Sequence, residues 1–213
     1  MTTTLDVMLL ESDPGAADAA AETLTAAGHR VHRCHEVGLG AFPCNGVIDP
    51  KKCPLMMPVD VALLVRRHPY PRPTPLEDGV SCAIRAGVPV VADGPGVLDP
   101  FEPWEAGRVH DGDVVGACLA GAARAQATLI EQIRPRVDAL LIRAGVDPDH
   151  VTLEAEADGP RLRIVIRGPV PPALQNPLAV RVLDAVRAVG RRTFGQVDVA
   201  VESDLSPAVP TPR

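Results

Sequence analysis

Hydrophobic residues in the first half of the chain occur in short, continuous runs separated by helical or irregular segments. The runs rich in Val, Leu and Ala predict β-strands at residues 5–10, 29–33, 59–65 and 88–92. Between them, apolar spacing and a closing glycine predict helices at residues 16–28 and 76–86. Because such strands lack a polar face, we expect an α/β domain with a parallel sheet covered on both sides.

The second half of the chain has a different pattern, in which long helical periods flank alternating segments. It first predicts a helix at 114–144, with a kink or break at Pro135. Strands at 151–157 and 162–167 follow, joined in a hairpin around Asp158-Gly159-Pro160. A helix at 177–189, capped by Asn176, and a strand at 197–202 complete the pattern. We therefore expect a small α+β domain (α-β-β-α-β) at residues 113–203 and a disordered, proline-rich tail at 204–213.

Three segments of the first half resemble response-regulator receiver domains. The segment LDVMLLESDPGAADAAAETLTAAGHRV is similar to their first strand, acidic loop and first helix, VDVALLV to their third strand, and GVPVVADG to their fourth. The resemblance implies a doubly wound, flavodoxin-like parallel sheet over residues 1–112.

At the positions that a receiver needs for phosphorylation, this sequence departs from the family pattern. Glu11-Ser12 keeps one of the two metal-binding acids, Val65-Arg66 stands where the phosphoacceptor aspartate is expected, and no lysine follows Lys52. The position of the fourth-strand hydroxyl residue falls near Asp93-Gly94. Phosphoryl transfer needs a bridging metal and cations that neutralise developing charge. The sequence therefore predicts a pseudo-receiver that cannot be phosphorylated.

A long irregular segment, residues 33–58, stands where a receiver has a helix. It contains Cys34, Cys44 and Cys53, and Cys82 follows in the next predicted helix. Loops of this length are usually functional or held by something, and we expect this one to start at the carboxyl edge of the sheet, where doubly wound folds bind ligands. Four thiolates suit zinc or an iron–sulfur cluster. We predict a metal site formed by these four cysteines, with His35 as a substitute ligand.

Other interpretations of the cysteines stay open at this point. A redox pair such as Cys34–Cys44 or Cys44–Cys53 is one, and inert buried thiols are another; Cys118 is interpreted as a small core residue. The acids Glu11, Asp13, Asp60 and Asp93 are either a hard-cation site or, more often in such cases, the remains of one.

Composition narrows the classes of partner. A net charge of −6 and only 2% aromatic residues argue against nucleic acid, which is bound through basic surfaces and stacking platforms. No run approaches the roughly 18 apolar residues of a membrane span, and the start lacks the basic region of a signal peptide. We therefore expect a cytoplasmic protein that does not associate with membranes, and the alanine, proline and arginine content is typical of a GC-rich bacterium.

Together these features predict a non-catalytic bacterial regulatory or sensory protein. A thiolate-bound metal or iron–sulfur centre would replace phosphorylation, and the α+β domain would bind a protein partner or self-associate. The alternatives are an interaction module with incidental cysteines and a thiol enzyme that uses Cys34 or Cys44 as nucleophile. Neither a Walker loop nor a G-x-S-x-G motif is present in the sequence.

Overall fold

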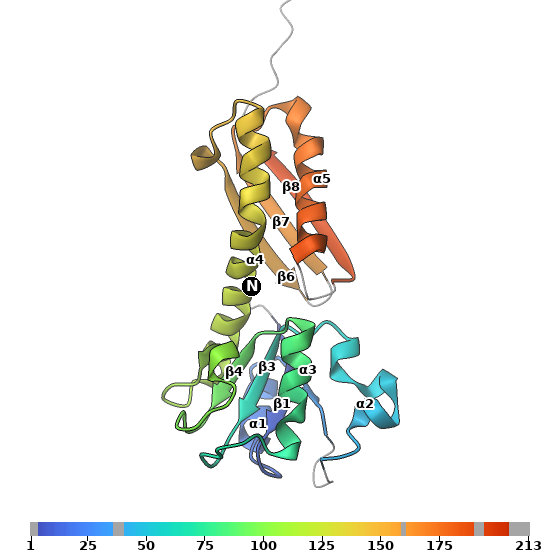
Figure 1. Ribbon diagram of the computed structural model, residues 1–213, viewed down its shortest axis with the longest axis vertical. Coiled ribbons are helices and arrows are strands. Elements are labelled where there is room, and N and C mark those ends of the chain that lie inside the picture. Colours follow the sequence, from blue (N-terminus) through green and yellow to red (C-terminus); the bar gives the residue numbers. More distant parts are fainter. Residues whose placement is uncertain (1–3, 36–40, 159–160, 190–193, 205–213) are drawn as a thin grey trace, which may run out of the picture. The chain divides into compact units, whose positions relative to one another are not determined.

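The computed structural model describes residues 4–35, 41–158, 161–189 and 194–204. The chain divides into two compact units, the first formed mainly by residues 1–125 and the second by the residues from 126 onward (Figure 1). The predicted turn residues Gly159 and Pro160 and nearly all of the predicted tail lie outside the described residues.

The first unit is built on a five-stranded sheet with the order β2-β1-β3-β4-β5, in which all neighbouring strands run parallel. The strands are β1 (Asp6–Glu11), β2 (Arg30–Arg33), β3 (Val61–Val65), β4 (Val90–Asp93) and β5 (Glu105–Arg108). The prediction of a parallel sheet is confirmed, and its order is compatible with a flavodoxin-like, doubly wound fold.

Helices cover both faces of this sheet (Figure 1). On one face, Val7 and Leu9 of β1 share a buried cluster with residues of α1 (Asp18–Ala26) and of the first part of α4 (Val114–Arg143). On the other face, Met8 and Leu10 pack with α3 (Asp78–Ala86), which η3 (Pro75–Glu77) precedes. Because every side chain of β1 and β3 is buried, the strands appear in the sequence as unbroken apolar runs.

In the part of the chain that the structure describes, two connections of the first unit are formed by short helical turns and irregular segments. Between β2 and β3, the described residues form α2 (Asn45–Ile48), η1 (Pro50–Lys52) and η2 (Pro54–Met56). Between β4 and β5 the helical turn is η4 (Glu102–Trp104). The prediction that an irregular segment replaces the receiver helix is therefore confirmed for its described residues, whereas residues 36–40 lie outside them.

The second unit confirms the predicted element order. The second part of α4 is followed by η5 (Pro148–His150), β6 (Thr152–Asp158), β7 (Arg161–Gly168), α5 (Pro172–Val189) and β8 (Gln196–Ser203). The strands form a separate sheet with the order β6-β7-β8, in which β7 and β8 are parallel. Since two residues separate the neighbours β6 and β7, these strands run antiparallel. Leu162, Ile164 and Ile166 of β7 form the core with the two helices.

Two prolines lie inside helices. The helix α4 continues through Pro135, so the predicted break is absent, and α5 begins at Pro172, so the prediction of Asn176 as its cap was wrong. Both Pro135 and Pro177 are exposed. The carbonyl that each leaves without an amide partner therefore lies on the solvent side, where water satisfies it. Although α4 has 30 residues, no helix among those described is long and apolar enough to span a membrane.

Gly94, directly after β4, permits the close approach of two strand ends. Its φ is +114°, and a Cβ at this position would lie 2.0 Å from the carbonyl oxygen of Arg66. We expect Gly94→Ala to lower the free energy of unfolding by about 3 kcal/mol or more, measured by urea denaturation. The matched control is Gly28→Ala, with a φ of +87° and no atom within 4 Å of the added Cβ. It should cost only about 1–2 kcal/mol, and equal losses would contradict the role of the contact.

Candidate functional site at the carboxyl edge of the first sheet

A charged or titratable residue lies at or just beyond the carboxyl end of each strand of the five-stranded sheet. Glu11 ends β1, His35 follows β2 at a short distance in sequence, Arg66 follows β3, Asp93 ends β4 and Arg108 ends β5. Doubly wound sheets bind their ligands at this edge, next to the point where the strand order reverses. Here that point lies between β1 and β3.

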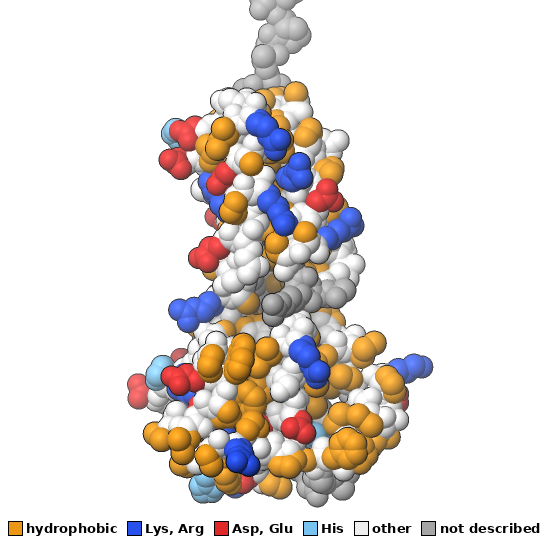
Figure 2. Space-filling model, in the orientation of Figure 1, with side chains coloured by type: hydrophobic (Ala, Val, Ile, Leu, Met, Phe, Trp, Pro, Cys, Tyr) orange, Lys and Arg blue, Asp and Glu red, His pale blue; other side chains and the backbone are white. Residues whose placement is uncertain are grey.

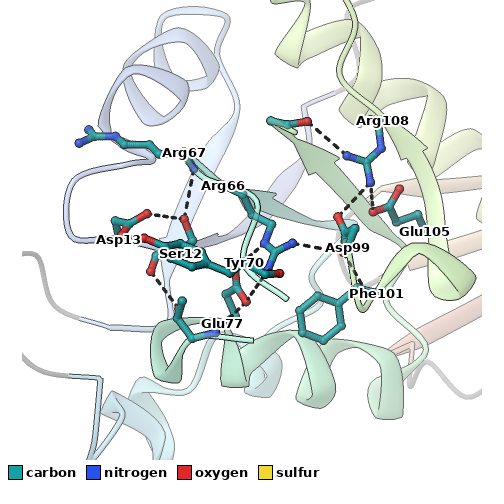
Figure 3. Close-up of polar contacts among 12 residues, drawn as sticks. Ser12, Asp13, Arg66, Arg67, Tyr70, Glu77, Asp99, Phe101, Glu105 and Arg108 are labelled. Carbon is teal, nitrogen blue, oxygen red and sulfur yellow. Dashed lines mark hydrogen bonds and ion pairs between the residues drawn. The ribbon is translucent and has the colours of Figure 1, made fainter. Parts of the chain in front are cut away.

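A buried ion pair occupies the end of β3 (Figure 3). The side chains of Arg66 and Glu77 are 1% and 0% exposed, and Nε of Arg66 donates to Oε1 of Glu77 at 2.7 Å. Nη2 of Arg66 donates to the other carboxylate oxygen at 3.4 Å and to the carbonyl of Tyr70 at 3.2 Å. The bidentate contact neutralises a charge that would otherwise be very costly to bury.

A second ion-pair group continues this network toward β5. Nη1 of Arg66 lies 3.8 Å from Oδ1 of Asp99, whose other oxygen accepts a hydrogen bond from Arg108 at 2.9 Å. Arg108 also donates to Glu105 at 2.6 Å. Burial acts to raise the pKa of Asp99, but hydrogen bonds from the Phe101 amide and from Arg108 hold it below its ordinary value. Burial and a hydrogen bond to Asp99 raise the pKa of Glu105 to about 7.

The segment after β1 is joined to the segment after β3 by hydroxyl groups (Figure 3). Tyr70 Oη and Ser12 Oγ each donate to a different oxygen of Asp13, both at 2.7 Å. Ser12 Oγ also accepts from the amide of Arg67 at 3.2 Å, and Thr74 Oγ1 donates to the carbonyl of Ser12 at 2.9 Å. Asp13 is therefore held by protein groups on both oxygens.

The strand ends carry residues other than those that the resemblance to a receiver would place there. Arg66, a buried cation, lies at the end of the third strand, where the resemblance implies an aspartate. The acids named from the sequence also fail to converge, because Asp60 precedes β3 and accepts the Asp6 amide at 2.8 Å at the opposite edge. Glu11 accepts the Ala17 amide at 3.2 Å and lies 3.6 Å from Arg33.

Four cysteines gather on the α3 side of the same edge. Cys34 is 7% exposed and packs in the buried cluster that contains residues of α3, with Cys44 against it. Burial, and after it the nearby thiols of Cys44, Cys53 and Cys82, raise the pKa of Cys34 to about 12. The four cysteines that the sequence singled out are thus neighbours in space.

Two glycines allow this approach. A Cβ on Gly79 of α3 would lie 3.0 Å from Sγ of Cys34, and Cys82 follows Gly79 by one helical turn. A Cβ on Gly46 would lie 3.2 Å from Sγ of Cys53. The backbone also joins the segments, since the amide of Asn45 donates to the carbonyl of Cys34 at 3.4 Å.

The fifth cysteine and the thiol-enzyme alternative are separate from this group. Cys118 is fully buried in the cluster on the other face of the sheet, as expected for a core residue. A catalytic thiol needs a lowered pKa, whereas the pKa of Cys34 is raised. Cys34 therefore does not fit the role of nucleophile.

His35 is buried with both ring nitrogens lacking a hydrogen-bond partner among the described residues. Burial lowers its pKa, and the carboxylates of Asp78 and Glu11 oppose this effect. The ring is therefore neutral at pH 7. A neutral imidazole with an unpaired nitrogen is the form that binds metals.

No three His, Cys, Asp or Glu side chains in the described parts of the chain are already arranged to hold a metal ion. Comparison of the chain with protein-family models, with curated proteins and with solved structures gives no match. The interpretation of the site therefore depends on the residues themselves.

Sequence reasoning missed the ion-pair network around Arg66. The sequence did contain one local signal: Thr74-Pro75-Leu76-Glu77 has the spacing of a capping box, and the structure contains that box. An exposed acid at such a position would do no more than stabilise the helix dipole. Glu77 is instead fully buried and neutralises Arg66.

The Arg66–Glu77 pair yields a stability test. Glu77→Gln keeps the capping box but leaves the Arg66 guanidinium without its main counter-charge. We expect a loss of about 3–5 kcal/mol in the free energy of unfolding. As a control, Asp18→Asn removes the 52%-exposed partner of Arg33 and should cost about 0–1 kcal/mol. Comparable losses in the two variants would mean that the buried pair contributes no more than a surface pair.

Glu105 yields a pH test. Its folded-state pKa of about 7 exceeds the ordinary value of 4.5, so between these values the folded chain binds more protons than the unfolded chain. Ionisation of Glu105 therefore lowers stability as the pH rises through this window. Glu105→Gln should remove this component, on the order of 3 kcal/mol over the whole window, so that the difference in Tm between variant and wild type changes with pH there. Parallel Tm–pH curves for the two proteins would contradict the assignment.

Proposed function

We propose that this chain is a cytosolic bacterial regulatory protein in which a thiolate-bound metal or iron–sulfur centre replaces phosphorylation of a receiver-like domain. The observation that carries the proposal is the gathering of Cys44, Cys53 and Cys82 around the buried Cys34. These residues come from an irregular loop and from α3, and they meet at the edge where folds of this class bind ligands.

The chemistry of four thiols favours a soft metal. Zinc and iron–sulfur clusters both take four cysteine thiolates, and the unpaired ring of His35 offers a further ligand at the same edge. Binding would require the thiols to lose protons and turn toward one point. It would also tie the loop of residues 41–57 to α3, and that loop has little helical structure of its own.

Arg66 argues against phosphorylation as the signal in this domain. Its guanidinium stands at the end of β3, where a phosphorylated receiver would need an acid and a metal ion, and it is paired with Glu77. The same Glu77 ends η3 and directly precedes α3, the helix that carries Cys82. A change at the thiols would therefore act on a helix whose start is anchored to the end of β3.

We assign partner binding or self-association to the second unit. Its two helices lie on one side of the sheet (Figure 1). On the other side, Arg167 of β7 is paired with Glu154 of β6 and with Glu202 of β8, and Arg163 is 3.7 Å from Glu202. This charged face is open to a complementary surface.

The metal centre is tested on protein purified without oxygen and without chelators. We expect zinc at about one per chain, or iron with acid-labile sulfide and a visible absorption band. Cys53→Ser should reduce metal affinity by about tenfold or more, since even indirect support of a ligand is worth that much. Cys118→Ala, on the opposite face, is the matched control and should bind as wild type. A colourless, metal-free protein, or equal loading of Cys53→Ser, would refute the centre.

A disulfide switch is a second candidate, favoured by the packing of Cys44 against the buried cluster that contains Cys34. The Cys44 thiolate would attack oxidised glutathione and release one glutathione as a thiolate. Cys34, which is not a free nucleophile at neutral pH, would pass its proton to this released thiolate and then displace the second glutathione from the mixed disulfide. The chain loses two hydrogen atoms and the oxidant is reduced to two thiols. Alkylation followed by peptide mass analysis should find the Cys34–Cys44 link, and a link between other cysteines, or none, would exclude this switch.

A further inference from the structure

Exposed hydrophobic side chains concentrate in the loop of residues 41–57. Of the ten large hydrophobic residues that are exposed in the described chain, five lie in this loop: Phe42, Val47, Ile48, Met56 and Met57. Phe42 is 80% exposed, Met56 70% and Ile48 65%. Figure 2 shows hydrophobic side chains gathered over the α2 segment of the first unit. Single exposed apolar residues are common, but a concentration of this kind marks an interaction surface.

The loop of residues 41–57 has an inner side that packs against the domain, so the exposure of its outer side chains does not result from a lack of packing of the whole loop. Cys44 and Leu55 pack against the buried cluster on the α3 side of the sheet, and Pro54 is itself buried. Asp49 caps η1 by accepting the Lys51 amide at 3.1 Å. The inner residues anchor the loop while the apolar side chains project outward.

The same loop carries the only two lysines of the sequence, Lys51 and Lys52. Both are exposed, and no ion pair joins either ammonium group to a described residue. The charge is local, because the whole chain has a net charge of −6. A surface that attracts this loop is therefore one that carries negative charge.

The exposure of the apolar side chains indicates the shape of the occupant. Side chains that are 65–80% exposed project from the surface and do not line a groove. They suit a soft apolar layer into which they can insert, below a layer of anionic groups that lysine stems can reach. In a bilayer, the lysine ammonium groups would contact the lipid phosphates, and the neighbouring apolar side chains would contact the acyl chains.

We propose that the loop of residues 41–57 binds the surface of a membrane that contains anionic phospholipids. This is peripheral association, which needs no spanning helix, and it differs from the expectation drawn from hydropathy alone that the protein does not associate with membranes. It goes beyond the proposed thiol centre and does not depend on it, because the interacting side chains are Phe42, Ile48, Met56, Lys51 and Lys52.

The test is cosedimentation of the full chain with vesicles of phosphatidylcholine containing phosphatidylglycerol, and with vesicles of phosphatidylcholine alone. We expect binding to the anionic vesicles that weakens as salt is raised. Lys51→Gln with Lys52→Gln should lower the partition coefficient about 30-fold. Phe42→Ser with Ile48→Ser should lower it at least about 100-fold. These positions are exposed, so the Tm should stay that of wild type.

Matched controls use exposed residues of the same unit outside the loop. Val97→Ser with Leu98→Ser removes apolar surface, and Arg72→Gln removes one exposed cation. Both should bind vesicles as wild type does. Absence of binding by the wild type, or equal losses in loop and control variants, would overturn the proposal. A concentration-dependent dimer that the loop variants abolish, without vesicle binding, would instead assign the loop to a second copy of the chain.

Discussion

A buried guanidinium at the end of β3 sets the organisation of the first unit. Because Arg66 is almost completely removed from water, its charge is neutralised from within the unit: Glu77 from the start of the third helix and the carbonyl of Tyr70 accept hydrogen bonds, and Asp99 of the β4–β5 connection lies 3.8 Å away. Asp99 in turn fixes Arg108 at the end of β5. The irregular connections of this edge are thus held by charge neutralisation, where a receiver would instead leave room for an incoming phosphoryl group.

The two sides of the carboxyl edge differ in their chemistry. Toward β4 and β5 it is closed by ion pairs, with each carboxylate engaged by arginine or by backbone amides. Toward β2 it holds thiols and a histidine whose polar atoms have fewer partners. Buried polar atoms without a hydrogen-bond partner occur on both sides of the edge among the described residues: the two ring nitrogens of His35, and Nη1 of Arg66, which lies 3.8 Å from Asp99.

The elements that could be predicted from the sequence are those in which the spacing of apolar residues matches the buried face of a strand or helix. The apolar strands β1, β3 and β4 and the alternating β6, β7 and β8 were all placed from periodicity. The strand β5 was missed, because Glu-Ala-Gly-Arg has neither an apolar run nor an alternation, and it forms only by pairing with β4. The gathering of the cysteines could be foreseen, since strand ends in a parallel sheet meet at one edge. The Arg66 network could not, because Glu77 and Asp99 are 11 and 33 positions away and no local pattern pairs them.

The distribution of lysine has a practical consequence. All other basic side chains, apart from histidine, are arginine, so Lys51 and Lys52 are the only side-chain primary amines of the chain. Any acylating reagent, fluorescent ester or enzymatic acetylation will therefore mark the loop between Cys44 and Cys53 and otherwise only an unblocked amino terminus. A reporter group can be placed beside the thiols without altering the sequence, and acetylation at this one place would remove the entire local positive charge.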